Sequence, residues 1–235
     1  MDGRAVLITG THRGLGRALA RAFAEAGRPL VVHGRREADA LEVAAEVRSL
    51  GCPAVEAAFG DLREAALGQR LADAGERVGG VGTLILCAGI LGPMQPLLDT
   101  PTETFAEVMR INVDAQHAVV RAVVPGMLAR GRGVVLWLTS GLGRFALPNY
   151  GAYCASKHAV EGLAKVLHAD YGERGIVSVA IAPGMVDTDM LHAAIGSDAS
   201  EHTPPERAAR GFVRFEGSVS AEHAGASLDI APWLP

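Results

Sequence analysis

The sequence has few cysteines, few lysines and no long apolar run. Its three cysteines, Cys52, Cys87 and Cys154, are far apart and odd in number, which predicts neither a disulfide framework nor a zinc site. Its strongly apolar runs, such as 81–86 and 134–138, are far shorter than the ~20 residues that cross a bilayer. The first residues lack the layout of a signal peptide. We therefore expect a cytoplasmic protein that contacts no membrane and holds no metal.

Neither sign of charge dominates the composition. The chain of 235 residues has 22 Lys and Arg against 26 Asp and Glu, so its formal net charge is −4. This balance argues against a nucleic-acid partner. With 49% hydrophobic and 20% charged residues, the chain can bury a substantial core and is not disordered. Only Lys157 and Lys165 are lysines among the basic residues, so a lysine inside a motif is a notable choice.

Short aliphatic runs alternate with longer amphipathic segments, the pattern of βαβ units in a parallel sheet. The predicted strands are 5–9, 30–33, 54–58, 83–87, 133–139 and 176–182. The predicted helices are 15–26, 38–50, 63–77, 104–129 and 152–174. No linker or repeat divides the sequence. We expect one α/β domain over residues 1–235, a Rossmann-type doubly wound parallel sheet of six to seven strands with helices on both faces.

The regular alternation weakens after Pro183. Helical spacing over 190–210 is interrupted by Gly196 and by the pair Pro204-Pro205, and 226–230 has the composition of a last strand. We expect residues 188–212 to be a mobile segment that covers the substrate.

A glycine-rich segment joins the first predicted strand to the first predicted helix, with glycines at Gly10, Gly14 and Gly16. Glycine lets the backbone turn tightly and approach a ligand, and the N-terminus of the helix suits a diphosphate. The spacing alone is also compatible with an ordinary β–α turn. The strand before it and the helix after it are the context that dinucleotide binding requires, so we predict a dinucleotide site.

The spacing T-G-x-x-x-G-x-G resembles the short-chain dehydrogenase/reductase family in its single-domain form. The resemblance continues through residues that follow the predicted strands or open the next helix. In order they are Asp61 and Leu62, Ala88 and Gly89, Asn112, Ser140, Tyr153 with Lys157, and Pro183, Gly184, Val186 and Thr188. Their spacing also matches, with 13 residues from Ser140 to Tyr153 (153 − 140) and four from Tyr153 to Lys157 (157 − 153).

The pair Tyr153 and Lys157 has a chemical reason of its own. Two residues four apart on a helix lie on the same face. A tyrosine with its ordinary pKa of ~10 exchanges protons poorly at neutral pH, and a nearby ammonium should lower that pKa. The pair is also compatible with an ordinary polar pair on a helix surface. Ser140 and Asn112 in register favour the catalytic interpretation.

The resemblance implies a role for each residue. Tyr153 exchanges a proton with the substrate oxygen, Ser140 hydrogen-bonds that oxygen, and Lys157 tunes Tyr153 and binds the cofactor ribose. Asn112 holds a water of a proton relay, although it also suits a kink in a long helix. Thr188 binds the nicotinamide carboxamide and suits a helix N-cap as well. Asp61 binds the adenine amine. The remaining cofactor contacts come from Gly10, Arg13, Gly14, Leu15, Gly16, Leu62, Ala88, Gly89, Pro183, Gly184 and Val186.

The residues after the second predicted strand bear on which nicotinamide cofactor binds. An acidic side chain there binds the adenosine ribose and repels a 2′-phosphate, whereas arginine pairs with that phosphate. Gly34 stands at the position of the acid and is followed by Arg35 and Arg36, and Arg13 lies in the glycine loop. NADP(H) is therefore favoured over NAD(H). The two arginines are also compatible with a solvated pair at a helix start.

The sequence departs from the family in two places. Cys87 replaces an asparagine that ties neighbouring strands together, which puts the local sheet bonding in question. His12 replaces a small loop residue and is expected to face solvent.

We thus expect an NADP(H)-dependent carbonyl reductase or alcohol dehydrogenase that transfers hydride between nicotinamide C4 and a small carbonyl or secondary alcohol. Two alternatives stay open, an NAD-dependent alcohol dehydrogenase and a non-catalytic nucleotide-binding regulatory protein. The expected pocket is mostly apolar, with Leu142, Phe145, Leu147, Asn149, Tyr150, Met190, Leu191 and Ile195. Family members usually pair their two long helices, here 104–129 and 152–174, which implies a homodimer or homotetramer.

Overall fold

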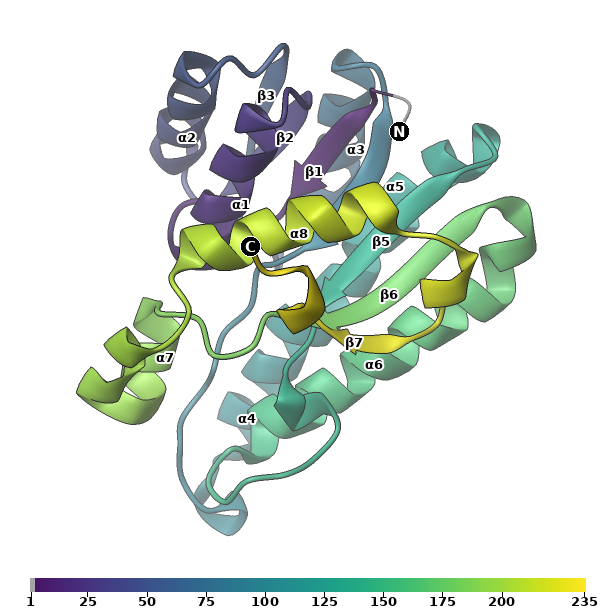
Figure 1. Ribbon diagram of the computed structural model, residues 1–235. Coiled ribbons are helices and arrows are strands. Elements are labelled where there is room, and N and C mark those ends of the chain that lie inside the picture. The colour runs from purple at the N-terminus through teal and green to yellow at the C-terminus, as the bar shows by residue number, and fades with distance from the viewer. Residues whose placement is uncertain (1–2) are drawn as a thin grey trace.

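The structure is a computed structural model that describes residues 3–235, so Met1 and Asp2 lie outside the described residues. Seven parallel strands form one sheet in the order β3-β2-β1-β4-β5-β6-β7 (Figure 1). They are β1 Ala5–Ile8, β2 Leu30–Gly34, β3 Val55–Phe59, β4 Val81–Leu86, β5 Gly133–Leu138, β6 Ile176–Ala182 and β7 Ser227–Asp229. The predicted fold class is confirmed, and the weak pattern over 226–230 forms the seventh strand.

Helices cover both faces of the sheet, which explains why the central strands are aliphatic throughout. Every residue of β1 and β2 is buried. One face carries the core around Phe23 and Phe212, and the other carries the core around Trp137. The first face is covered by α1 Gly14–Glu25, α2 Glu37–Ser49 and α8 Pro205–Ser218. The second is covered by α3 Leu67–Arg77, α5 Ala115–Ala129 and α6 Gly151–Tyr171.

The strand order reverses between β1 and β4, because the chain proceeds outward from β1 to β3 and then returns to the other side of β1. Loops after the two central strands therefore leave in opposite directions and open a crevice at their carboxyl ends. All the loops that carry predicted site residues start at this edge of the sheet.

The predicted helix 104–129 begins two residues earlier and is not uniform. It consists of α4 Thr102–Met109, a π turn Arg110–Asp114 and α5. A π turn inserts a residue into the α-helical ladder and often marks a functional position. Asn112 lies at its centre, so the kink that the sequence suggested for this residue is present.

The predicted mobile segment 188–212 is wrong in its second half. Residues 189–201 form α7 Asp189–Ile195 and a 3₁₀ turn Gly196–Glu201. An isolated β-bridge between Val186 and Thr203 joins the chain before this segment to the chain after it. The chain then enters α8, which packs on α1 (Figure 1) and buries Ala208, Ala209, Phe212 and Phe215. Those apolar residues follow helical spacing after Pro205, a helix-starting proline, so 205–212 belong to the core.

A buried ion pair fixes the other end of α8. The Glu216 carboxylate accepts hydrogen bonds from Arg28 Nη1, at 2.8 Å to each oxygen, and from Thr83 Oγ1 at 2.7 Å. Glu216 and Arg28 are both almost fully buried. Removing the Glu216 carboxylate would therefore break a buried ion pair and a buried hydrogen bond at once.

Candidate active site

In the glycine loop between β1 and α1, the glycine positions are closely packed or have backbone angles that favour glycine. Gly10 and Gly14 have φ values of 75° and 53°, a region that L side chains rarely adopt. A Cβ on Gly10 would lie 2.9 Å from the Ala88 Cα, and a Cβ on Gly16 would meet the Gly10 carbonyl oxygen. Arg13, the residue before α1, makes no side-chain cap, so it leaves the first N–H groups of the helix to a ligand.

Thr9 supplies hydrogen bonds at the end of β4, where Cys87 replaces the family's asparagine. Its Oγ1 accepts hydrogen bonds from the main-chain N–H groups of Cys87 and Ala88, both at 3.1 Å. The Gln116 Nε2 on α5 donates to the Ala88 carbonyl at 3.0 Å. The end of β4 is therefore tied to β1 and α5 through its main chain, and these ties do not use the cysteine side chain. Burial raises the pKa of Cys87 to about 12, so its thiol is neutral.

The Asn112 side chain is buried and braces the loop after β4. Its Oδ1 accepts from Ile90 N at 2.8 Å, and its Nδ2 donates to Ile90 O at 2.8 Å and to Ser156 Oγ at 3.0 Å. Ser156 in turn donates to the Tyr153 carbonyl at 2.7 Å. Both amide hydrogens of Asn112 are thus engaged within the protein, so a relay water held through this residue stays a prediction.

Ser140, Tyr153 and Lys157 lie together at the carboxyl end of β5. Ser140 lies close enough to the Tyr153 hydroxyl to lower its pKa. Lys157 Nζ lies 5.4 Å from the centroid of the Tyr153 ring and donates to the Leu138 carbonyl at 2.7 Å. A Cβ on Gly89 would lie 3.1 Å from Asn112 Oδ1 and 3.9 Å from Lys157 Nζ. The four residues with predicted catalytic roles therefore surround one small region beside Gly89.

The expected lowering of the Tyr153 pKa is not found. Burial raises the pKa of Tyr153 to about 12, and the hydrogen bond from Ser140 only partly opposes this. Burial likewise lowers the pKa of Lys157 to about 8. Desolvation disfavours the charged form of each group, so it outweighs the attraction between ammonium and phenolate in this state. The tyrosine keeps its proton at neutral pH.

The adenosine side explains why Gly34 carries no acid. A Cβ on Gly34 would lie 2.8 Å from Ala40 N and 3.0 Å from the Asp39 Cβ, so the start of α2 fills the space. Arg36 binds Asp39 through Nε and Nη2, with the shortest contact at 2.7 Å. This pairing lowers the pKa of Asp39. Arg35 is exposed and makes no hydrogen bond or ion pair with any residue in 3–235. The two neighbouring arginines thus differ, and Arg35 is the one available to a ligand.

The sequence predicted that His12 faces solvent, but its side chain also lies near a carboxylate. Its Nδ1 lies 3.5 Å from Asp39 Oδ1, although the side chain is 40% exposed. Asp39 is hydrogen-bonded to Arg36, whereas His12 Nδ1 lies near its carboxylate and makes no hydrogen bond within residues 3–235.

Asp61 already has a partner. Arg63 Nε and Nη2 donate to its two carboxylate oxygens at 2.8 and 2.7 Å, and they lower the pKa of Asp61 to about 2. Arg63 also donates to Glu107 on α4 at 2.8 Å. Oδ1 also accepts from Arg63 N at 3.0 Å, so Oδ2 is the oxygen that keeps a second lone pair, and the contacts of Asp61 and Leu62 with adenine stay predictions.

The turn after β6 runs from Pro183 and Gly184 to Thr188, which caps α7. Thr188 Oγ1 accepts from Leu191 N at 3.4 Å and donates to Val186 O at 3.2 Å. Its methyl group would lie 3.3 Å from a Cβ on Gly14, so the cap lies against the glycine loop. Arg13 Nη1 pairs with Asp189 Oδ2 at 2.8 Å, and both side chains are largely exposed. Arg13 is therefore not free, but exposed pairs of this kind are weak and exchange partners readily.

Exposed apolar side chains cluster on the loops that follow β4, β5 and β6. The loop after β4 lies against the loop after β5, because Gln95 N donates to Asn149 O at 3.0 Å and Gln95 bridges to Tyr150. The exposed apolar residues on these loops are Met94, Leu97, Leu98, Phe145, Leu147, Met185 and Met190. Leu142 is buried, and Leu191 and Ile195 are half-buried.

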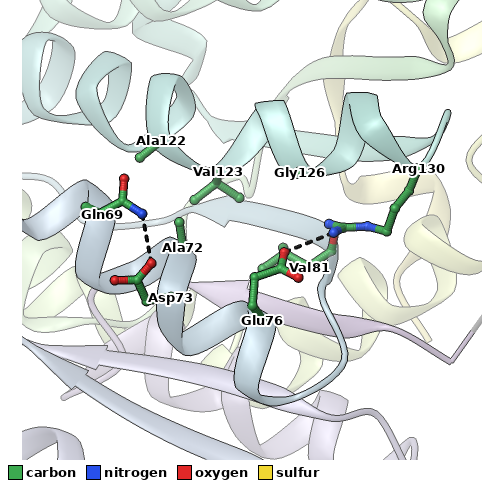
Figure 2. Close-up of a pocket in the computed structure, with 9 residues that line it drawn as sticks. All are labelled: Gln69, Ala72, Asp73, Glu76, Val81, Ala122, Val123, Gly126 and Arg130. Carbon is green, nitrogen blue, oxygen red and sulfur yellow. Dashed lines mark hydrogen bonds and ion pairs between the residues drawn. The ribbon is translucent and has the colours of Figure 1, made fainter.

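A hollow of about 190 Å³ between α3 and α5 lies elsewhere (Figure 2). It reaches Val81, at the amino end of β4, and is therefore remote from the loops described above. Two pairs of its polar side chains bind each other, Gln69 with Asp73 and Glu76 with Arg130. Within residues 3–235 no group of His, Cys, Asp and Glu side chains could hold a metal. No helix of that stretch is long and apolar enough to cross a membrane.

Comparison with known proteins identifies the family. The short chain dehydrogenase model matches residues 4–198. The chain belongs to this family. This short-chain dehydrogenase is 30% identical over 228 residues to the NADPH-dependent pterin aldehyde reductase of Arabidopsis thaliana, covering 97% of this chain and 93% of that protein.

Solved structures of other short-chain dehydrogenases have the same fold. A gluconate 5-dehydrogenase from Burkholderia cenocepacia J2315, in complex with NADP and tartrate, is 33% identical with a TM-score of 0.87, covering 97% of this chain and 94% of that one. A 7α-hydroxysteroid dehydrogenase complexed with NADH and 7-oxo glycochenodeoxycholic acid is 29% identical with a TM-score of 0.86, covering 97% and 92%. The short-chain dehydrogenase described here is thus an oxidoreductase, and its relatives differ in cofactor and substrate.

The site of this short-chain dehydrogenase fits a nicotinamide dinucleotide. A Cβ on Gly10 or Gly16 would clash with main-chain atoms, α1 begins without a side-chain cap, and Arg35 is unpaired among residues 3–235. These features suit a close, anionic diphosphate and a further phosphate nearby.

Several residues of the site had no local signal in the sequence. Thr9 and Gln116 support the end of β4, and Asp39 decides which arginine is free. Glu161 on α6 accepts from Thr139 Oγ1 at 3.2 Å and from Ser227 Oγ at 2.7 Å, beside the loop that carries Ser140. His33 contacts the glycine loop. Among these residues, Gln116 is the one that helical spacing could have indicated, because it lies four residues after Asn112 and therefore on the same face of the helix.

Proposed function

We propose that this protein is an NADP(H)-dependent oxidoreductase that transfers hydride between nicotinamide C4 and the carbonyl or secondary alcohol carbon of a small, mostly apolar substrate. One observation carries the proposal: the Tyr153 ring lies 5.4 Å from Nζ of Lys157, a residue that is only 6% exposed, and Ser140 acts on the same tyrosine hydroxyl. The lysine of an ordinary polar pair on a helix surface would be exposed to solvent.

The chain's own residues handle the proton and the oxygen of the substrate. The Ser140 hydroxyl holds the carbonyl oxygen by a hydrogen bond, and the Tyr153 hydroxyl gives its proton to that oxygen as it becomes an alcohol. Lys157 stabilises the phenolate that remains until solvent returns the proton. The nicotinamide, when bound, supplies or accepts the hydride at C4. In the oxidative direction the phenolate of Tyr153 takes the alcohol proton. Asn112 keeps the loop after β4 in place.

The cofactor preference rests on the space and charge after β2. Gly34 leaves no room for the acid that would bind a ribose 2′-hydroxyl, and Arg35 is free to pair with a 2′-phosphate. Arg13 would exchange Asp189 for a phosphate, and Arg36 would first have to leave Asp39. The pterin aldehyde reductase and the gluconate dehydrogenase, which are named with NADPH and NADP, add support.

The substrate class follows from the rim of the site. Exposed apolar residues on three adjoining loops favour a hydrophobic or aromatic carbonyl compound. The protonated state of Tyr153 at neutral pH favours carbonyl reduction over alcohol oxidation there. We further propose that residues 1–235 act as one cytoplasmic domain, that 188–203 cover the substrate, and that copies pair through α4, α5 and α6 as dimers or tetramers.

The test is NADPH oxidation with a panel of apolar ketones and aldehydes. Wild-type protein should turn over part of the panel, and Tyr153→Phe should lose at least about a hundredfold in kcat, because general acid catalysis contributes about 10²–10⁴-fold. Cofactor binding by Tyr153→Phe should persist, which serves as the folding control.

Two outcomes would replace this proposal. Cofactor binding without turnover, and without an effect of Tyr153→Phe, would indicate a non-catalytic nucleotide-binding protein. Equal affinities of the wild type for NADPH and NADH would favour an NAD-dependent alcohol dehydrogenase, in line with the neighbour that holds NADH.

A further inference from the structure

His33, near the end of β2, is a buried histidine that the proposed chemistry does not use. Its ring is 2% exposed. One ring nitrogen faces the glycine loop and the other faces the start of the loop after β3. These loops hold the expected diphosphate and adenine contacts, so the ring lies between the two parts of the cofactor site.

The partners of the ring fix its tautomer. Gly10 N lies 3.2 Å from Nδ1, and because a main-chain N–H can only donate, Nδ1 is the acceptor. Nε2 lies 3.0 Å from the Gly60 carbonyl oxygen, which can only accept, so Nε2 carries the hydrogen. His33 is therefore neutral, with both nitrogens in use.

The main chain of the same residue holds the glycine loop as well. The His33 carbonyl accepts from Thr11 N at 2.8 Å and from Thr11 Oγ1 at 3.1 Å. On its other side Gly10 is closely packed, since a Cβ there would lie 2.9 Å from the Ala88 Cα. The position of the first glycine thus depends on β4 from one side and on His33 from the other.

We propose that His33 is a positioning residue for the dinucleotide: through Nδ1 it sets the first glycine of the phosphate loop, and through Nε2 it holds that loop at a set spacing from the adenine loop. The inference rests on the proposed use of a nicotinamide dinucleotide. His33 is not itself one of the expected cofactor contacts; it acts through Gly10 and Gly60.

Protonation of the ring would break this arrangement. A hydrogen on Nδ1 would point at the Gly10 N–H, donor against donor. The charged groups that act on the ring are Arg70 from α3 and Asp61 and Glu64 from the loop after β3. Burial lowers the pKa of His33 below its ordinary 6.5. Cofactor affinity should therefore be constant near neutrality and fall as the pH drops through this lowered pKa.

Two substitutions separate the two ring contacts. In His33→Asn the side-chain oxygen lies near the position of Nδ1 and still accepts from Gly10. In His33→Gln the side-chain nitrogen lies near the position of Nε2 and still donates to Gly60, but the Gly10 N–H is left buried without an acceptor. We expect His33→Gln to weaken NADPH binding by about tenfold or more and His33→Asn by about threefold or less. In His33→Gln the buried Gly10 N–H, at the phosphate loop itself, has no acceptor, whereas in His33→Asn it is the Gly60 carbonyl that loses its donor, and a carbonyl tolerates this better than an N–H does.

The readouts are the NADPH dissociation constant, kcat and the Michaelis constant, and the melting temperature. His33→Gln should raise the Michaelis constant for NADPH while kcat at saturating cofactor stays near wild type. The fall of affinity in acid should be present in the wild type and absent in His33→Asn. His117→Gln, at an exposed position of α5 away from the cofactor loops, is the control and should leave the NADPH dissociation constant and its pH dependence unchanged.

Each outcome decides between positioning and mere packing. Equal losses of affinity in His33→Asn and His33→Gln, in step with equal losses of melting temperature, would overturn the inference. The inference would also be overturned if NADPH affinity fell at low pH in His33→Asn as it does in the wild type. This comparison is sufficient by itself if His33→Gln does not fold. If the wild type binds neither NADPH nor NADH, the proposed function and this inference fall together; if it binds NADPH and the variants bind equally well, only this inference falls.

Discussion

Replacing Arg35 by alanine should weaken NADPH binding far more than the same replacement of its neighbour Arg36. The two arginines are adjacent, identical in type and both exposed, but only Arg36 is held by a carboxylate, with contacts to Asp39 down to 2.7 Å. A 2′-phosphate can pair with Arg35 without breaking an existing interaction. To recruit Arg36 it must first compete with Asp39.

The magnitude follows from the kind of contact. A hydrogen bond to a charged group contributes about 1.5–3 kcal/mol, and the exposure of Arg35 places it at the lower end of this range. Arg35→Ala should therefore raise the NADPH dissociation constant about tenfold and leave that for NADH unchanged, because NADH has no 2′-phosphate. Arg36→Ala should change the NADPH constant by about threefold or less.

The assay is fluorescence titration of both dinucleotides into wild type, Arg35→Ala, Arg36→Ala and Asp39→Asn. Asp39→Asn releases Arg36, so Arg36→Ala should cost more NADPH affinity in that background than in the wild type. A larger effect of Arg36→Ala than of Arg35→Ala would refute the reasoning. So would an equal weakening of NADH by Arg35→Ala, because the contact would then not involve the 2′-phosphate.

Three further results are expected. Glu216→Gln should lower the free energy of unfolding in urea by about 3 kcal/mol, because it breaks the buried ion pair with Arg28. Glu56→Gln, which loses the exposed pair with Arg77, should lower it by less than about 1 kcal/mol, and equal losses would contradict the argument. NADPH affinity should weaken as the pH rises through about 8, where Lys157 loses its proton and its positive charge, and Lys157→Met should bind weakly without this step. Phe145→Ala should raise the Michaelis constant for aromatic ketones about tenfold but not that for a short aliphatic aldehyde, because the exposed ring offers apolar contact area; an equal rise for both substrates would point to a disturbed loop.

The local sequence was sufficient for the parts of the fold that depend on periodicity. Aliphatic runs and amphipathic helices in alternation dictate a parallel sheet, and parallel strands bring their carboxyl ends to one edge. The site residues follow strands or open α6, so their convergence was predictable from order alone. Residues 205–212 were misjudged because the two prolines before them mark a helix start as readily as a break.

Only the tertiary structure decided the properties that depend on neighbours distant in the sequence. The identity of the free arginine depends on where Asp39 lies, the bonding at Cys87 depends on Thr9, and the pKa values of Tyr153 and Lys157 depend on how deeply both are buried. The same is true of His33, whose two partners, Gly10 and Gly60, lie in the loops after β1 and β3. Sequence by itself determined which chemical groups are present and in what order along the sheet. Packing determined which of them are charged, paired or free, because desolvation and hydrogen bonding act through space and not along the chain.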